Sequence, residues 1–157
     1  MQSYEYLCGG SELLDIVEPL WKKLNDLHRL VSPHFSDRAA AHSFTARKQG
    51  FLEKTQNGQL RVEVVKTKAE QQVIAYCVST ITPDKTGEID SIFVEEDHRG
   101  NGIADHLMCG ALEWMEQAEV KAKILVVLWG NERVHAFYQR YGFFPLSATL
   151  MQKQALF

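Results

Sequence analysis

The chain has 157 residues, 45% of them hydrophobic, and its 17 basic and 20 acidic residues give a formal net charge of −3. This length predicts a single domain over residues 1–157 with one core of ordinary size. The basic residues are scattered, no segment reaches the length of about 18 apolar residues that a membrane span needs, and the N-terminus lacks the regions of a secretory signal. We therefore expect a cytoplasmic protein that has neither nucleic acid nor a membrane as a partner.

Three cysteines, Cys8, Cys77 and Cys109, lie far apart in the sequence and form no CxxC pair. An odd number at wide spacings argues against both a disulfide framework and a zinc site. We expect free thiols and no bound metal.

In the first part of the chain, alternating residues 2–7 predict a strand that ends at the Gly9-Gly10 pair. Apolar residues spaced by three and four then predict a helix over 12–31. Pro19 lies inside this pattern, so the helix either kinks there or begins near Ile16 with proline in its first turn. A second helix is predicted from Ser36 or Asp37 through Leu52, stopping near Asn57-Gly58.

The central part of the chain predicts strands over 60–67 and 72–82, which should form an antiparallel hairpin, followed by a neighbouring strand over 87–94. A helix over 103–119 should cover one face of this sheet.

The last part begins with the wholly apolar run ILVVLW, residues 124–129, which is typical of a strand buried on both faces and parallel to 87–94. A short helix over 132–141 and one or two final strands within 143–154 complete the series. An exposed last strand would allow two subunits to pair as a homodimer.

The segment from Gly87 to Ala104 joins the strand at 87–94 to the helix at 103 through a loop that contains Gly100 and Gly102. Backbone N–H groups at a helix start have no partner within the helix, so this loop is suited to bind an anion. It is not a dinucleotide fingerprint, because Asp105 replaces the third glycine and three strands precede it. The lysine of a phosphate-binding P-loop is also absent.

Two sequence blocks carry a resemblance to a known family. The first block consists of Arg99, Gly102 and Ala104. It matches a family loop in which a glutamine or arginine is followed by glycine three residues later and by glycine or alanine five residues later. Asn131, at a strand end, is followed by AFYQRYGF over residues 136–143, a slightly compressed form of the family's second block. With both blocks in the correct order, the chain resembles the GNAT superfamily of acyl-CoA-dependent N-acetyltransferases.

The resemblance implies an α/β (α+β) fold with a mixed, mostly antiparallel central sheet of about six or seven strands and about four flanking helices. A central pair of parallel strands should splay apart, because in this family a bulge bends one strand away from its parallel neighbour.

The resemblance also implies acetyl-CoA as co-substrate. Backbone amides of the loop would hold its pyrophosphate, and the free strand edge would hydrogen-bond its pantetheine arm. Asn131 would bind the cofactor near the splay. The implied loop residues are Arg99, Gly100, Asn101, Gly102, Ile103 and Ala104, and the implied edge residues are Ile92, Phe93 and Val94.

Tyr138 occupies the family's general-acid position, where it would contact the cofactor and protonate the leaving sulfur; the alternative is a packing aromatic. Glu88 and Asp90 project from one face of their strand, and either carboxylate could act as the base. A glutamate often lies near this position in the family, which favours Glu88, and the alternative is a solvated carboxylate. Residues 95–97 are interpreted as a solvated turn.

For the acceptor, we predict contacts with Asn25, His28, Phe35 and Asp90, because the strand at 87–94, the helix at 12–31 and the loop after that helix should border the cleft. The alternative for His28 is an ordinary surface or helix-end residue. Acidic, aromatic and histidine residues suit a cationic amine, so the first hypothesis is a small-molecule primary amine. A protein N-terminus or lysine is the enzymatic alternative. A CoA-binding sensor without turnover is the alternative outside catalysis.

Overall fold

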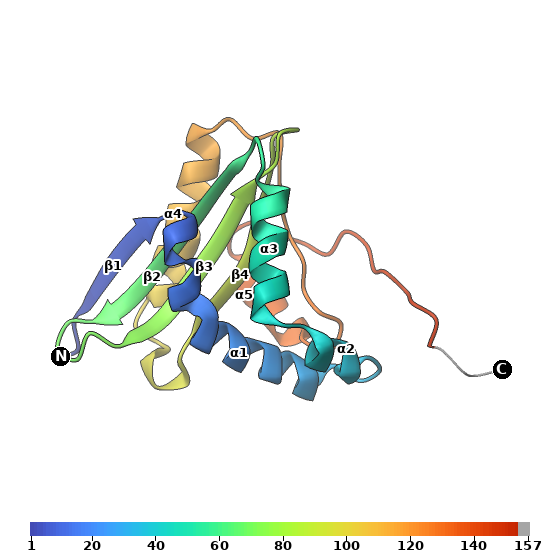
Figure 1. Cartoon of the computed structure of the whole chain (residues 1–157), viewed down its shortest axis with the longest axis horizontal. Helices are drawn as coiled ribbons and strands as arrows, with labels where there is room; N and C mark the ends of the chain where they lie inside the picture. Colours follow the sequence, from blue (N-terminus) through green and yellow to red (C-terminus); the bar gives the residue numbers. More distant parts are fainter. Residues whose placement is uncertain (154–157) are drawn as a thin grey trace.

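The computed structural model describes residues 1–153, and its centre is one five-stranded sheet in the order β1-β2-β3-β4-β5 (Figure 1). All neighbouring strands are antiparallel except β4 and β5, which are parallel. The strands are β1 (Tyr4–Gly9), β2 (Gln59–Thr67), β3 (Val73–Ile81), β4 (Thr86–Val94) and β5 (Ala122–Leu125). The α-helices are α1 (Leu14–Val31), α2 (Ser36–Ala41), α3 (Phe44–Lys54), α4 (Ile103–Gln117) and α5 (His135–Gln139).

The sheet separates two hydrophobic layers. On one face, α1 and α3 pack against strand residues such as Val64, Tyr76 and Phe93. On the other face, α4 and α5 pack against residues such as Cys77 and Ile89. Side chains alternate between the faces along each strand, so β4 contributes to both layers. This arrangement brings α3 and α5, which are far apart in the sequence, to opposite sides of the same strand.

The predicted hairpin of β2 and β3, the neighbouring β4 and the parallel crossover through α4 are confirmed. Pro19 lies within α1, so a helix start near Ile16 is wrong, and the helix bends in its first half (Figure 1). A proline inside a helix removes one backbone hydrogen bond, which accounts for the bend.

The single helix predicted from residue 36 to near residue 57 is in fact two helices, α2 and α3. His42 has an extended backbone, and Ser43 starts a new helix because its hydroxyl accepts a hydrogen bond from the Ala46 amide at 3.1 Å. Serine in an extended conformation is a favoured helix N-cap, so the chain changes direction there.

The predictions for the C-terminal part need correction. β5 begins two residues early and ends at Leu125, so residues 126–129 lie outside the sheet. The expected burial on both faces is wrong, since Val126 is 79% exposed. Residues 143–153 form no strand, and position 154 of the predicted final strands lies outside the described residues. The described sheet therefore has five strands rather than six or seven.

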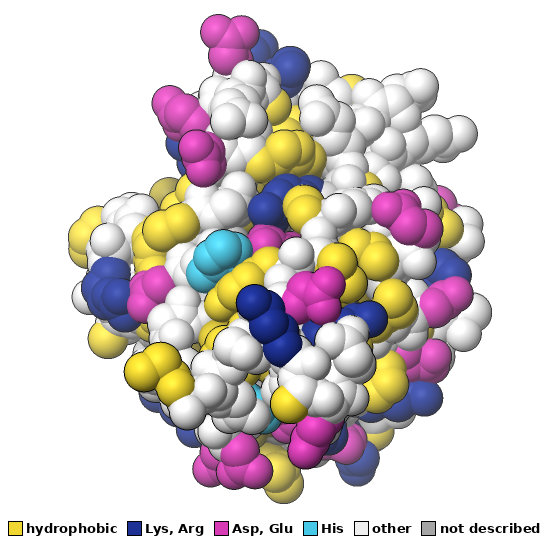
Figure 2. Space-filling model, turned by 90° about the vertical axis from the view of Figure 1, so that its left-hand side faces the viewer, with side chains coloured by type: hydrophobic (Ala, Val, Ile, Leu, Met, Phe, Trp, Pro, Cys, Tyr) yellow, Lys and Arg dark blue, Asp and Glu magenta, His cyan; other side chains and the backbone are white. Residues whose placement is uncertain are grey.

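The surface along the β1 edge, which faces the viewer in Figure 2, intermingles basic, acidic and apolar side chains. Within residues 1–153, none of the helices combines the length and the apolar character that crossing a membrane requires.

Two glycines offer a test of the packing around β3. A Cβ atom added at Gly58 would collide with the backbone carbonyl oxygen of Ile81, whereas one added at Gly50 in α3 would meet no atom within 4 Å. Gly58→Ala should lower the free energy of unfolding by about 1–3 kcal/mol, because the backbone must shift. Gly50→Ala should raise it by up to about 1 kcal/mol through helix propensity. Urea denaturation measures both, and equal effects would contradict this packing.

Candidate active site

The central feature of the site is the point where β4 parts from β5. Ser91 lies opposite Val78, but Ile89 lies opposite Ser79, so Asp90 is one additional residue in β4. This is a β-bulge, as the family resemblance implied. The parallel ladder with β5 ends at the pair Ile89 and Leu125, directly before the bulge. Residues 90–94 therefore present a backbone edge without a β5 partner.

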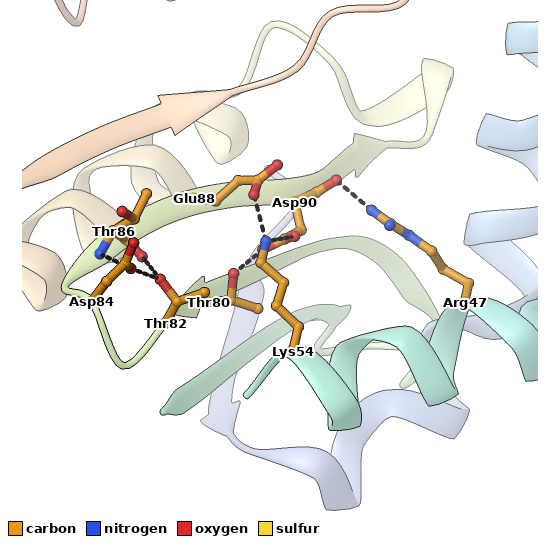
Figure 3. Close-up of polar contacts among 8 residues, drawn as sticks. All are labelled: Arg47, Lys54, Thr80, Thr82, Asp84, Thr86, Glu88 and Asp90. Atoms are coloured by element: carbon orange, nitrogen blue, oxygen red, sulfur yellow. Dashed lines mark hydrogen bonds and ion pairs between the residues drawn. The ribbon is translucent and has the colours of Figure 1, made fainter. Parts of the chain in front are cut away.

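Polar side chains hold the bulge from the side of α3 (Figure 3). The ammonium of Lys54 donates to Asp90 Oδ1 at 2.7 Å and also to Glu88 Oε2. The hydroxyl of Thr80 on β3 donates to the other oxygen, Asp90 Oδ2, at 2.6 Å. Glu88 and Asp90 thus project to the same face, as predicted, and share one cation.

Burial and ion pairing shift the pKa values of Asp90 and Lys54 in opposite directions. Burial is the largest influence on Asp90 and raises the pKa of its carboxyl, although the hydrogen bonds from Lys54 and Thr80 oppose the shift. Burial by itself would lower the pKa of Lys54, but its hydrogen bonds and charge interactions with Asp90 and Glu88 outweigh this and raise it. Lys54 is therefore a firmly charged ammonium between two carboxylates.

Arg47 of α3 connects the bulge to α1. Its guanidinium donates to the backbone carbonyl of Asp90 at 3.0 Å. Burial, and then the charge of Arg47, lowers the pKa of His28 on α1. Arg47, which the sequence did not single out, thus bonds the backbone of one predicted acceptor residue, Asp90, and its charge acts on a second, His28.

The other two predicted acceptor residues have local partners. The side-chain amide of Asn25 donates to the Ala39 carbonyl at 2.7 Å and ties α1 to α2. Phe35 directly precedes α2, and its backbone amide donates to the Ser32 hydroxyl at 3.3 Å.

The glycine loop between β4 and α4 is open. Gly100 and Gly102 have φ angles of 79° and 75°, and a Cβ atom on either would meet nothing within 4 Å. Left-handed backbone of this kind favours glycine. Arg99 fixes the start of the loop, since its Nε donates to the Val94 carbonyl at 2.9 Å and its guanidinium lies over the Phe93 ring.

The start of α4 has the properties that a phosphate group requires. The first helical hydrogen bond runs from the His106 amide to the Gly102 carbonyl, so the preceding amides of the helix have no partner within it. The Asp105 carboxylate in the first turn accepts hydrogen bonds from Arg140 at 2.6 Å and from Tyr141. The chain's own residues therefore fit the pyrophosphate of a CoA-type ligand, with amide donors beside open space.

Tyr138 lies on the opposite face of the sheet from Glu88. It belongs to α5 and packs against the layer that contains Ile92, Cys77 and α4. Burial raises the pKa of Tyr138 to about 12. Its phenol therefore stays protonated throughout the neutral and mildly alkaline range. Asn131 does not lie at a strand end as predicted, because β5 ends at Leu125. It is buried shortly before α5, and its side-chain oxygen accepts a hydrogen bond from Arg133 at 3.3 Å.

An open pocket of about 330 Å³ lies between α1 and the segment that follows β4. Sequence analysis missed most of its wall, because Lys23 and Arg133 carry no motif and residues 95–96 were interpreted as a solvated turn. Lys23 pairs with Glu95, which fixes one side of the pocket. The pocket is lined by Lys23, Leu27, Phe93, Glu95, Glu96, Arg99 and Arg133.

Comparison with known proteins identifies the family. The model of the acetyltransferase (GNAT) family matches residues 21–143, which is most of the chain. The chain belongs to the GNAT family. As a GNAT protein it is an acyltransferase with acetyl-CoA as its co-substrate. A search of curated proteins finds no match to the sequence.

Solved structures share the GNAT fold over nearly the whole chain. An aminoglycoside N-acetyltransferase, AAC(6')-Iy, in complex with CoA is 14% identical with a TM-score of 0.62, covering 99% of this chain and 97% of that one. A GCN5-related N-acetyltransferase from Ralstonia eutropha is 17% identical with a TM-score of 0.72, covering 96% and 99%. A ribosomal-protein-alanine N-acetyltransferase from Brucella melitensis is 14% identical with a TM-score of 0.59, covering 95% and 99%.

Within residues 1–153 of this GNAT domain, no three His, Cys, Asp or Glu side chains gather as a metal site would need.

The shared cation predicts a pH-dependent stability. Lys54→Met leaves Glu88 and Asp90 together without a counter-charge, so the free energy of unfolding should fall by about 1–3 kcal/mol near neutral pH. The loss should shrink as the pH falls, because the pKa of Asp90 rises further in the variant and protonation removes the repulsion. Urea denaturation at about pH 7 and about pH 5 measures the difference.

Lys48→Met is the matched control for this measurement. Lys48 lies on the same helix and pairs with Asp15 at 2.7 Å, but that carboxylate is largely exposed. A surface pair contributes about 0–1 kcal/mol, so the control should change stability little at either pH. Equal losses in the two variants, or a loss independent of pH, would contradict the paired role of Lys54.

Proposed function

We propose that the protein transfers an acetyl group from acetyl-CoA to the primary amine of a small molecule, by direct attack in a ternary complex. The observation that carries the proposal is the parting of β4 from β5 at Asp90. The free edge lies between the face that carries Glu88 and the face that carries Tyr138. An acyl group at this gap is accessible to a base from one side and an acid from the other.

Acetyl-CoA supplies the thioester carbon that is attacked and the sulfur that leaves. The backbone amides of residues 99–104 hold its pyrophosphate, and the edge at Ile92, Phe93 and Val94 binds the pantetheine arm as a neighbouring strand would. Asn131 binds the cofactor near the gap. Open space at Gly100 and Gly102 supports the loop assignment.

Glu88 is the proposed general base. Both oxygens of Asp90 accept hydrogen bonds, from Lys54 and Thr80, whereas Glu88 uses only Oε2 to contact Lys54. Glu88 Oε1 therefore remains available to take the proton of the acceptor ammonium, directly or through one water. Asp90 contributes negative charge that attracts this ammonium. Lys54 limits the repulsion between the two carboxylates.

Tyr138 is the proposed general acid. A phenol whose pKa is about 12 is protonated at neutral pH and can donate its proton to the departing thiolate. Because the pKa of Tyr138 is raised, its phenol loses this proton only at high pH. Loss of activity through deprotonation of Tyr138 is therefore expected near pH 12.

The size of the pocket between α1 and the segment after β4 supports a small acceptor, since a volume of about 330 Å³ suits a small ligand. Its wall combines Glu95 and Glu96 with Lys23, Arg99 and Arg133, so the negative charge that suits a cationic acceptor comes from Glu88 and Asp90 instead. One similar structure contains an aminoglycoside acetyltransferase with a bisubstrate analogue of CoA and acetylneamine. His28, Phe35 and Asn25 remain proposed acceptor contacts at the border of this region.

A panel of acceptors tests the substrate class through release of free thiol from acetyl-CoA. We expect turnover with small polycationic amines, and for the best of them a kcat/KM at least about tenfold above that for peptides with free N-termini or lysines. Preference for a peptide would replace the small-molecule acceptor with a protein acceptor. Tight acetyl-CoA binding without thiol release from any acceptor would indicate a sensor.

Replacing Tyr138 tests the acid. Tyr138→Phe removes only the hydroxyl, so kcat should fall by about tenfold or more while the dissociation constant of acetyl-CoA stays nearly unchanged. Tyr141→Phe is the matched control, because the same atom is lost three residues further along the chain, where the hydroxyl contacts Asp105. The control should retain kcat within about twofold. Unchanged kcat in Tyr138→Phe would contradict the role.

Replacing Gly102 tests the phosphate loop. Gly102→Glu places bulk and a negative charge among the amide donors, so acetyl-CoA binding in calorimetry should be lost. Two controls separate the causes. Gly102→Ala introduces the same backbone strain without the bulk and the negative charge, and Gly50→Glu adds the same charge at an open helical position. We expect most of the affinity to persist in both controls. Retained affinity in Gly102→Glu would place the pyrophosphate elsewhere.

A further inference from the structure

The ammonium of Lys54 bonds the same two carboxylates that the proposed function offers to an acceptor. Its Nζ donates to Asp90 Oδ1 at 2.7 Å and to Glu88 Oε2, so it contacts the residue of the bulge and the proposed base together (Figure 3). The ammonium of a free primary amine carries the same three N–H donors as that of lysine. A free amine that bonded both carboxylates in this way would therefore have to replace the ammonium of Lys54.

Lys54 controls access to Asp90. Only 3% of the Asp90 side chain is exposed, and its two oxygens accept hydrogen bonds from Lys54 and Thr80. The Glu88 side chain is 18% exposed, and its Oε1 has no hydrogen-bond partner within residues 1–153. While Lys54 stays in place, an acceptor can therefore bond Glu88 but not the carboxylate of Asp90.

The ammonium of Lys54 can leave without removing the other supports of the bulge. Lys54 is the last residue of α3, 28% of its side chain is exposed, and the ammonium is carried on a flexible four-carbon stem. Thr80 still holds Asp90 Oδ2 in its absence, and Arg47 still holds the Asp90 backbone carbonyl. The two carboxylates therefore remain in place as a binding site for another ammonium group.

The charges beside the bulge limit how many ammonium groups it can hold. Glu88 and Asp90 carry two negative charges, and Lys54 compensates one of them. The guanidinium of Arg47 adds a positive charge on the same side, above the ring of Phe51 at 4.4 Å. A charge that is removed from water without a partner is costly, so one further ammonium is matched here and a second is not.

We propose that Glu88 Oε2 and Asp90 Oδ1 form an ammonium-binding site that the chain fills with its own Lys54. Lys54 thereby selects acceptors that bring one ammonium group to β4, a consequence that rests on the function proposed above. Further ammonium groups of a polycationic acceptor would bind away from this strand. A short diamine gains a second contact at β4 only when Lys54 is removed, because its second ammonium can then take the place of Nζ.

Chemical complementation tests the site without acetyl-CoA or turnover, so its result does not depend on the proposed function. Lys54→Ala removes the side chain beyond Cβ, and the atoms removed correspond to those of propylammonium. We expect propylammonium to raise the Tm of Lys54→Ala saturably, by at least about 2 °C, because it binds the folded state. If this variant is unfolded without ligand, recovery of the native circular dichroism in the same titration is the readout.

Controls separate an ammonium site from general effects of the added compounds. Tetramethylammonium has no N–H donor and propanol has no charge, so neither should give a saturable rise in the Tm of Lys54→Ala at matched ionic strength. Lys54→Met fills the space with an uncharged stem, and Lys48→Ala loses a pair with the largely exposed carboxylate of Asp15. Neither variant should respond to propylammonium. No saturable rise in Lys54→Ala, or an equal rise in any control, overturns the site.

Steady-state kinetics with two amines of the same length test the selection. Putrescine carries two ammonium groups, and pentylamine has a methyl group in place of the second. Relative to the unmodified chain, Lys54→Ala should raise the ratio of kcat/KM for putrescine to that for pentylamine by at least about fivefold, mainly through a lower KM for putrescine. A merely structural role of Lys54 would change both amines alike, so an unchanged ratio overturns the selection. If no amine is turned over, the proposed function fails, whereas the titration with propylammonium still decides the site.

Discussion

The additional residue in β4 is the constraint on which the site depends. Without the bulge at Asp90, β4 would keep its register with β3 and could continue its ladder with β5, and the strand edge at residues 90–94 would be occupied. A bulged strand twists more strongly and loses local pairing, so it needs support from side chains. Lys54 and Thr80 provide that support by bonding the two oxygens of Asp90, and Arg47 bonds its backbone carbonyl.

Two regions of opposite electrostatic character lie at the ends of this edge. The loop at residues 99–104 and the start of α4 offer amide donors and the positive end of a helix dipole, which suit phosphate. The α3 face offers Glu88 and Asp90, which suit an ammonium group. A single cation, Lys54, bonds both carboxylates while leaving one Glu88 oxygen unbonded. One strand can therefore orient an anionic cofactor and a cationic acceptor in the same reaction.

Local signals in the sequence predicted the order of elements from β1 to α4, apart from the break between α2 and α3, and the glycine loop. Tyr138 and Asn131 were singled out by the family resemblance. They could not predict the bulge, because it depends on the register between β3 and β4, nor Lys54, which is more than thirty residues from its partners. The break between α2 and α3 was visible in principle, since Ser43 is a good N-cap followed by helix-forming residues. The apolar runs at 124–129 and 143–153 predicted strands from pattern alone, and the single chain gives most of these residues no neighbour with which to pair.

Amide hydrogen exchange with and without acetyl-CoA tests the central claim most directly, namely that the edge beyond Asp90 and the loop after it bind the cofactor. The amides at the start of α4 have no helical partner, so they should exchange rapidly in the free protein. Acetyl-CoA should slow exchange at residues 92–94 and 100–104 and leave β1 and β2 unchanged. Slowing confined to α1, around Lys23 and Leu27, with none in the loop would contradict the account.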